Sequence, residues 1–351
     1  MIRNIFNCIS IHNGGGIIYL SMMHSHLDKK GNLILLDYRA KNDLKPFLKA
    51  ETKFIKKSIF RNLIVLKERI KYSITFRRYL KNKNKKEFFC EYYLNGIPPL
   101  FRFSIITNKV FILFQNRNLF SYLNYFDGSL FFKSSYLIYH ILHKILINLF
   151  MRNSDNLLVQ TNIMKKIISV ARPKNKIFVE DFYWKNITKK FYQNYLSQDK
   201  SNKNHCLLSA IKNISQMNTI FFYPASFNPH KNHKILFSSF ENISKNFSKN
   251  VKLLVTIDKN IMPNSLRENK NILFLGNQSI KTIFDIYSFV DYLIFPSLNE
   301  SLGLPLIEAK LNNLPIISSD LDYVYEVCNP SLTFNPYSEK DICEKIIKVL
   351  S

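Results

Sequence analysis

The second half of the chain alternates short apolar runs with longer amphipathic stretches, and this alternation restricts the possible folds more than any other feature. The apolar runs predict strands at residues 219–224, 252–257, 271–276, 291–296 and 314–319. The stretches between and after them predict helices near residues 231–246, 280–289, 304–312 and 338–350. A regular strand–helix alternation is typical of a parallel sheet with helices on both faces.

The first half shows the same alternation less regularly. Strands are expected at residues 4–11, 32–38, 109–114, 156–160 and 176–180, and helices at 53–70 and 133–151. A chain of 351 residues is long for a single core. We therefore predict an α/β protein with two Rossmann-like domains, residues 1–200 and 201–351, joined near 196–205. Ligands of such folds bind at the carboxyl ends of the strands, here in a central cleft between two facing domains.

Charge is distributed very unevenly along the chain. Residues 1–200 hold 35 Lys and Arg against 12 Asp and Glu, a net charge of +23, whereas residues 201–351 have a net charge of +2. A lysine-rich composition alone would charge both halves, so the asymmetry favours an anionic partner. No nucleic-acid-binding motif accompanies the basic residues. We expect no nucleic acid, and we expect the basic helix 53–70 to meet an anionic membrane surface.

Cysteine usage and apolar runs indicate the compartment. The five cysteines are odd in number and show no metal-binding spacing, which is typical of reduced, cytosolic thiols. The apolar stretch at the start is too broken for a signal peptide, and no run reaches the length of a membrane span. We expect a cytoplasmic protein that associates peripherally with the inner face of the cytoplasmic membrane.

Three consecutive glycines follow the first expected strand, in HNGGGIIYL (12–20). Glycine lets the backbone approach a ligand closely because it has no Cβ. If a helix opens after Gly16, its free N–H groups favour a phosphate. An ordinary tight turn explains the same residues, so this loop alone is a weak signal.

A lysine stands where a helix is expected to begin, in YPASFNPHKNHKILFSSF (223–240). Lys231 could hold a pyrophosphate as a point charge. His230 and His233 flank it, but they lack an obvious third ligand, so no metal site is predicted. The Asp320-Leu-Asp322 triplet reads as a turn or a helix cap rather than a metal ligand.

The most informative stretch is NESLGLPLIE, residues 299–308. Gly303 permits an unusual turn and Pro305 suits the first turn of a helix, so Glu300 lies in a loop and Glu308 on a helix. Along a helix eight residues span about 12 Å, whereas the two carboxylates of a glycosidase lie roughly 5–10 Å apart. The spacing therefore favours separate tasks for the two glutamates. Two solvated side chains are the alternative, which the apolar setting weakens.

These residues together resemble the family-4 (group 1) retaining glycosyltransferases, which have the two-domain GT-B fold. The resemblance is most specific in residues 271–335, where Glu300 and Glu308 match the family's glutamate pair. The glycine loop, FQNRN (114–118), VQTNIMKKII (159–168) and PHKNH (229–233) extend it over most of the chain, with a looser match in residues 40–105. Members that act on O-antigen or capsule repeat units are the most similar.

The resemblance implies roles for individual residues. Glu308 would accept hydrogen bonds from the ribose of a nucleotide, and Glu300 would contact the donor sugar near the reacting carbon. Lys231 would hold the diphosphate. Backbone N–H groups of Gly303 and Leu304 would meet the sugar or phosphates. The remaining implied contacts are Gly15 and Gly16 at the diphosphate and Asn116 at the sugar.

The sequence departs from the family pattern at three places. Ser226 stands near a position where relatives carry arginine, Leu302 replaces phenylalanine, and Asn116 replaces a frequent histidine. The expected function is transfer of a sugar from a nucleotide-sugar to a lipid-linked saccharide, with retention and without a metal or other cofactor. The alternatives are a phosphorylase of the same fold, a member without catalytic activity, and a basic nucleic-acid-binding protein.

Overall fold

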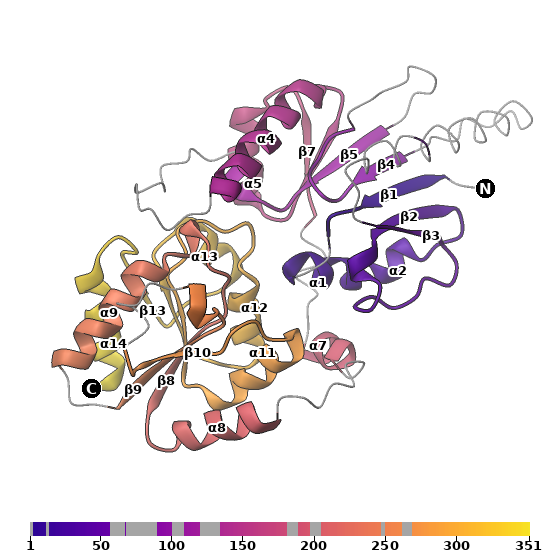
Figure 1. Cartoon of the computed structure of the whole chain (residues 1–351). Helices are drawn as coiled ribbons and strands as arrows, with labels where there is room; N and C mark the ends of the chain where they lie inside the picture. Colours follow the sequence, from indigo (N-terminus) through magenta and orange to yellow (C-terminus); the bar gives the residue numbers. More distant parts are fainter. Residues whose placement is uncertain are drawn as a thin grey trace, which may run out of the picture. The chain divides into compact units, whose positions relative to one another are not determined.

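The structure is a computed structural model that describes residues 3–11, 14–56, 67, 90–99, 109–119, 134–180, 189–196, 205–246, 250–261 and 269–351. The chain divides into two compact units (Figure 1). The first comprises Met1–Tyr122 with Lys133–Asn186, and the second comprises Leu123–Phe132 with Ile187–Ser351. The domain boundary predicted at residue 200 lies outside the described residues and stays a prediction.

The first unit is built on a parallel sheet with the strand order β3-β2-β1-β4-β5-β6-β7 within the described residues. Every pairing in it is parallel. Its strands are β1 (Asn4–Cys8), β2 (Asn32–Asp37), β3 (Glu51–Ile55), β4 (Cys90–Tyr93), β5 (Lys109–Phe114), β6 (Asn156–Val159) and β7 (Lys176–Val179). Its helices and 3-10 turns are α1 (Gly14–Met22), α2 (His24–Leu27), η1 (Tyr38–Ala40), η2 (Arg117–Leu119), α4 (Ser134–Phe150) and α5 (Asn162–Ala171).

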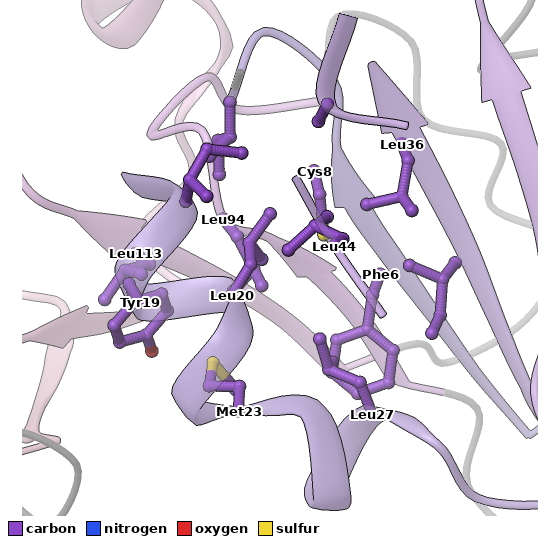
Figure 2. Close-up of a cluster of buried hydrophobic side chains, with 14 of the residues drawn as sticks. Phe6, Cys8, Tyr19, Leu20, Met23, Leu27, Leu36, Leu44, Leu94 and Leu113 are labelled. Carbon is purple, nitrogen blue, oxygen red and sulfur yellow. The ribbon is translucent and has the colours of Figure 1, made fainter. Parts of the chain in front are cut away.

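Central strands of this unit are largely buried because helices cover both faces of a parallel sheet. All six residues of β2 are buried. On one face, α1 and α2 pack through Tyr19, Leu20, Met23 and Leu27 onto side chains of the sheet (Figure 2). Helix α5 begins at a polar residue, Thr161, whose hydroxyl accepts a hydrogen bond from the Met164 N–H.

The second unit has a parallel sheet with the strand order β10-β9-β8-β11-β12-β13 within the described residues. Its strands are β8 (Thr219–Tyr223), β9 (Val251–Val255), β10 (Ile272–Phe274), β11 (Tyr292–Phe295), β12 (Ile316–Ser319) and β13 (Leu332–Phe334). Its helices are α7 (Lys189–Leu196), α8 (His205–Ser215), α9 (His233–Asn246), α11 (Ile280–Ile286), α12 (Leu304–Leu311), α13 (Asp322–Val327) and α14 (Glu339–Leu350). Short 3-10 turns are η3 (Pro229–Lys231), η4 (Lys259–Ile261) and η5 (Tyr287–Phe289). The last helix, α14, packs beside α9 (Figure 1).

Each sheet contains a point where the chain reverses its direction of travel across the sheet. In the first unit, the chain runs from β1 to β2 and β3 and then resumes at β4 on the other side of β1. In the second unit, it runs from β8 to β9 and β10 and resumes at β11, beside β8. Loops diverge at such a point and leave room for a ligand at the carboxyl ends of the two strands. The loops after β1, β8 and β11 are therefore the places to look for a site.

The prediction of two parallel-sheet α/β units is confirmed, and most predicted elements agree with the structure within two residues. Strands β3, β4 and β13 were not predicted. The predicted helix 53–70 is wrong at its start, because residues 53–55 belong to β3. The remainder of that helix, apart from residue 67, lies outside the described residues. Parallel pairing of ETKFI with the buried strand β2 overrides the helical spacing of its apolar residues.

Among the described residues, no helix combines the length and the apolar character needed to cross a membrane.

Candidate active site

The loops after β8 and β11 bring a lysine and a glutamate together. Lys231, at the end of η3, places its Nζ 2.5 Å from Oε1 of Glu300. The two side chains are 15% and 10% exposed, so the pair is mostly buried but still reachable from solvent. They are 69 positions apart in sequence and meet because β8 and β11 are neighbours in the sheet. Both were predicted site residues, and the structure places them in contact.

Hydrogen bonds fix the two loops to each other. The backbone N–H of Leu298 donates to the carbonyl of His230 at 2.7 Å. The buried hydroxyl of Tyr223 lies 2.8 Å from both the Lys231 carbonyl and the Ser297 hydroxyl. The Tyr323 hydroxyl donates to the carbonyl of Ser297 at 2.6 Å. The lysine backbone is therefore anchored, and its ammonium group is aimed at Glu300 by a rigid frame rather than by a free loop.

The environment of Glu300 keeps its carboxyl ionised. Burial by itself raises the pKa of Glu300, but the nearby charges of Lys231 and His230 and the hydrogen bonds from Lys231 and Ser297 outweigh it. The net result is a pKa below the ordinary value of 4.5. The site therefore holds a fixed negative charge next to a fixed positive one at neutral pH.

A left-handed glycine starts the helix that follows this loop. Gly303 has φ 69° and ψ 61° and precedes α12, whose second residue is Pro305. A Cβ added to Gly303 would lie 3.1 Å from Cδ1 of Leu306. Glycine is thus required both by the backbone conformation and by the close approach of Leu306. The predicted loop–helix arrangement of NESLGLPLIE is confirmed, with Leu304 as the first residue of the helix.

Glu308 lies in the middle of α12 and has an environment of a different kind. Its side chain is 6% exposed. The Tyr192 hydroxyl donates to Oε1 at 2.8 Å, and the Tyr287 hydroxyl donates to Oε2 at 3.0 Å. Burial raises the pKa of Glu308, the two phenols lower it, and the net pKa stays above the ordinary value. A buried carboxylate held by two hydroxyl donors is suited to accept further hydrogen bonds from a polyhydroxyl ligand.

His233 is a buried residue at the start of α9 that packs among aromatic rings. It is 2% exposed and packs against the rings of Tyr223, Phe227 and Phe237. Burial, followed by the charges of Lys231 and His230, lowers the pKa of His233 to about 3, which keeps the ring neutral. Within the ranges that the structure describes, no three potential metal-ligating side chains gather in one place.

Ser226 lies in the loop after β8, where it is exposed and accepts a hydrogen bond from the Asn228 amide at 2.8 Å. The loop is therefore closed by a serine–asparagine contact at the position where a cation was expected from the family pattern. Ser226 itself is uncharged and does not replace the expected arginine as a cation. Lys231 and His230 are the cationic or ionisable side chains that the same loop contributes.

The remaining predicted site residues belong to the first unit. Helix α1 begins at Gly14, so Gly15 and Gly16 lie in its first turn rather than before it. A Cβ on Gly16 would come within 2.7 Å of Ile11 Cγ2, so tight packing alone already demands glycine there. Asn116 follows β5 and its carbonyl accepts from the Leu119 N–H at 3.3 Å. Contact of these residues with the Lys231–Glu300 site stays a prediction.

Two contributors to the site escaped the sequence reasoning, namely Tyr192 and Tyr287. Tyr287 lies at the end of a predicted helix, and its apolar neighbours make it look like an ordinary core residue. Tyr192 is 116 positions from Glu308, and no local pattern connects them. Burial of a glutamate requires a partner, so the apolar surroundings of Glu308 were the one available signal that hydroxyl donors had to exist.

Comparison with known proteins agrees with this geometry. Residues 207–351 match the model of the family described as glycosyl transferases group 1. The matched segment contains the Lys231–Glu300 pair, Gly303 and Glu308. The resemblance to this family is therefore confirmed for the second unit.

Two curated relatives are similar over shorter segments. The O-antigen chain mannosyltransferase RfbU of Salmonella typhimurium is 32% identical over 120 residues, which are 32% of this chain and 33% of RfbU. The serotype-specific mannosyltransferase WbdA of Escherichia coli is 30% identical over 115 residues, which are 30% of this chain and 14% of WbdA. The chain thus spans a third or less of the relatives that it matches.

Solved structures resemble the chain over its whole length. The crystal structure of HepE from Anabaena, in complex with UDP and glucose, superposes with a TM-score of 0.63 at 14% identity. The match covers 100% of this chain and 90% of HepE. At such low identity the likeness concerns the fold, and together with the two parallel sheets it confirms the GT-B fold class.

Proposed function

We propose that the chain is a glycosyltransferase that moves a sugar from a nucleotide-sugar to a saccharide acceptor with retention of configuration. The observation that carries this proposal is the Lys231–Glu300 pair, 2.5 Å apart, at the carboxyl ends of the two central strands of the second unit. Glu308 follows on the adjoining helix as a separate buried acceptor. The cation of Lys231 suits the diphosphate of a nucleotide-sugar, the anion of Glu300 suits its sugar, and the acceptor Glu308 suits the ribose hydroxyls.

The chemistry assigns one task to each side chain. Cleavage of the bond between the sugar and the diphosphate leaves negative charge on the phosphate, and the Lys231 ammonium can stabilise it. The first N–H groups of α12 add the positive end of a helix dipole. The sugar gains positive charge in the transition state, and the ionised Glu300 is the nearby carboxylate. Neither task requires a metal, which supports a metal-independent reaction.

The acceptor is proposed to be a lipid-linked saccharide of O-antigen or lipopolysaccharide assembly. Support comes from RfbU and WbdA, whose names describe an O-antigen chain mannosyltransferase and a serotype-specific mannosyltransferase. The donor is correspondingly proposed to be a nucleotide-activated hexose, with GDP-mannose and UDP-glucose as the first compounds to test.

A peripheral membrane location is also proposed, and α4 supplies a contact surface in addition to the predicted helix 53–70. Its side chains Ile141, Leu142, Ile145 and Leu149 are exposed and recur at the spacing of one helix face. An exposed apolar stripe on a basic half of the chain is suited to an anionic lipid surface. The positive net charge of residues 1–200 is proposed to bind anionic lipid rather than nucleic acid.

The activity is tested by transfer of radiolabelled hexose from each donor to membrane lipid extract, with the wild type and Glu308→Ala. We expect transfer from one donor and a loss of about a hundredfold or more in the variant. Transfer that is undiminished in Glu308→Ala would remove Glu308 from the site. A phosphorylase would instead release sugar phosphate when inorganic phosphate is supplied.

The membrane location is tested by sedimentation with vesicles of neutral or anionic lipid. Leu142→Glu with Leu149→Glu should reduce binding to anionic vesicles, and binding should weaken as salt is raised. Equal binding to neutral vesicles, or a gel shift with nucleic acid at physiological salt, would contradict the assignment.

A further inference from the structure

The most unusual polar arrangement outside the lysine–glutamate pair is the double phenol contact on Glu308. Each carboxylate oxygen accepts one tyrosine hydroxyl, from Tyr192 at 2.8 Å and from Tyr287 at 3.0 Å. All three side chains are buried, with exposed fractions of 6% for Glu308, 0% for Tyr192 and 3% for Tyr287. A single structural hydrogen bond would satisfy a buried glutamic acid, so two donors on opposite oxygens indicate an ionised, oriented carboxylate.

The two tyrosines are themselves held firmly by other rings. Tyr287 makes edge contacts with Phe222 of β8 and Phe284 of α11. Tyr192 stacks on the ring of the same Phe284, with the two ring centroids 5.0 Å apart and an angle of 14° between the ring planes. Both phenols are thus fixed by packing onto one phenylalanine. Their hydroxyl positions, and with them the plane of the carboxylate, are determined by the core of the second unit.

A carboxylate offers about four lone pairs, two on each oxygen. One phenol on each oxygen therefore leaves acceptor capacity on both. Two remaining lone pairs, one per oxygen and in a fixed plane, match a vicinal diol such as the two hydroxyls of a ribose. A freely rotating carboxylate would offer the same acceptors but would lose rotational entropy on binding.

We propose that Tyr192 and Tyr287 are positioning residues that orient the Glu308 carboxylate for the diol of the nucleotide. They act through Glu308 and do not touch the ligand. This inference rests on the proposed function, since it assumes that Glu308 receives a nucleotide. It assigns a role in that site to Tyr192, which lies in α7, before the segment that matches the family.

The test measures nucleotide binding by calorimetry with the full-length chain and UDP or GDP as the probe. Tyr192→Phe and Tyr287→Phe each remove one oxygen atom and keep the ring packing. A matched control exists in the first unit, where the buried Tyr93 hydroxyl donates to Glu91 Oε2 at 3.0 Å. Tyr93→Phe removes the same kind of tyrosine–glutamate bond, and Glu308→Ala removes the acceptor itself.

We expect the dissociation constant of the bound probe to rise about tenfold in Tyr192→Phe and in Tyr287→Phe. It should stay within about twofold of the wild type in Tyr93→Phe and rise further in Glu308→Ala. In the transfer assay, KM for the donor should rise while kcat changes little, because the reacting centre is untouched. If Tyr192 and Tyr287 contributed only to folding, Tyr93→Phe would change the dissociation constant as much as their Phe variants do. The KM for the donor would then be unchanged in all three variants.

The pH dependence gives a second readout that packing does not affect. Loss of a phenol donor disfavours the ionised carboxylate, so the pKa of Glu308 rises further in both Tyr→Phe variants. Nucleotide binding by these variants should therefore weaken at a higher pH than in the wild type as the solution is acidified. An unchanged acidic limb would contradict the proposal.

The remaining outcomes separate the inference from the proposed function. If Glu308→Ala loses binding and both Tyr→Phe variants bind as the wild type does, the positioning role is overturned and the function stands. If Tyr192→Phe binds more tightly, Tyr192 competes with the ligand, and its positioning role is likewise overturned. If the wild type binds neither probe and transfers no sugar, the function fails and the inference fails with it.

Discussion

Glu300 and Glu308 lie on the same loop–helix segment, yet the protein stabilises their charges in opposite ways. Glu300 is paired with a full positive charge on Lys231, and its pKa lies below the ordinary value. Glu308 is surrounded by neutral phenols, and its pKa lies above the ordinary value. A cation compensates for desolvation completely, whereas two hydroxyl dipoles compensate only in part.

These two environments suit the side chains to different tasks. A carboxylate that is already neutralised by a lysine can face a developing positive charge while the lysine faces the departing phosphate. A carboxylate held by neutral donors keeps its charge available to attract further hydroxyl groups. The two glutamates thus differ in chemical environment as well as in sequence position, and three experiments test this difference.

The largest effect is expected from Lys231→Ala. The substitution removes the charge that we propose stabilises the leaving diphosphate, and it leaves Glu300 without its ion-pair partner. We expect kcat/KM of sugar transfer to fall by about a hundredfold or more. The control is Lys245→Ala, which breaks an exposed pair with Glu241 on α9 and should have no measurable effect on transfer. A similar loss in both variants would show that the Lys231–Glu300 pair is not specific to the reaction.

An intermediate effect is expected from the turn that separates the glutamates. Gly303→Ala imposes a left-handed conformation on alanine and brings its Cβ within 3.1 Å of Leu306. Gly276→Ala imposes nearly the same φ, 68°, with nothing within 4 Å of the Cβ. We expect a loss of about 1 kcal/mol for Gly276→Ala and about 2 kcal/mol for Gly303→Ala, measured from urea unfolding midpoints. Equal losses would mean that Leu306 relaxes freely and that only the backbone requires glycine.

The smallest effect concerns the pH dependence of stability. Because the folded pKa of Glu300 is lowered, its stabilising contribution is complete above the ordinary pKa of 4.5 and is lost as the pH falls below it. Because the folded pKa of Glu308 is raised, its cost is absent below 4.5 and develops as the pH rises from there. On acidification, the wild type should therefore lose its stability advantage over Glu300→Gln. Relative to Glu308→Gln, the wild type should become more stable as the pH falls. Each change stays below about 1.4 kcal/mol per pH unit. If the stability difference from the wild type depended on pH in the same way for both variants, the two glutamates would not differ in how their charges are stabilised.

The alternating pattern of the sequence was sufficient for the architecture because parallel strands buried on both faces must be continuously apolar. The pattern did not predict the strands that are only partly buried. Strand β3 has a single buried residue, Ile55, and its half-buried Lys53 belongs equally well to a helix pattern. Strands β4 and β13 are short, with alternating rather than continuous burial in β4. In these cases the pairing with a neighbouring strand, which no local pattern encodes, decides the structure.

The same division applies to the site. Lys231, Glu300 and Gly303 could be predicted because each lies in a loop that joins elements whose type is readable from the sequence. Glu308 could be predicted because it lies within a helix that the sequence indicates. Tyr192 and Tyr287 could not, since a buried tyrosine in an apolar stretch looks like core until its hydroxyl is located in space. For Gly16 a sequence pattern cannot separate ligand approach from packing, and the structure adds a packing reason through Ile11.

The placement of α7 has a practical consequence for anyone who dissects the chain. Residues Lys189–Leu196 precede the segment that matches the family and precede the boundary expected near residue 200, yet they belong to the second unit. A recombinant fragment that starts at residue 201 would lack Tyr192, uncover the face of Phe284 and deprive Glu308 of one donor. A fragment that starts at Ile187 would retain all three. The choice of a start codon thus decides whether an isolated half keeps both hydroxyl donors of Glu308.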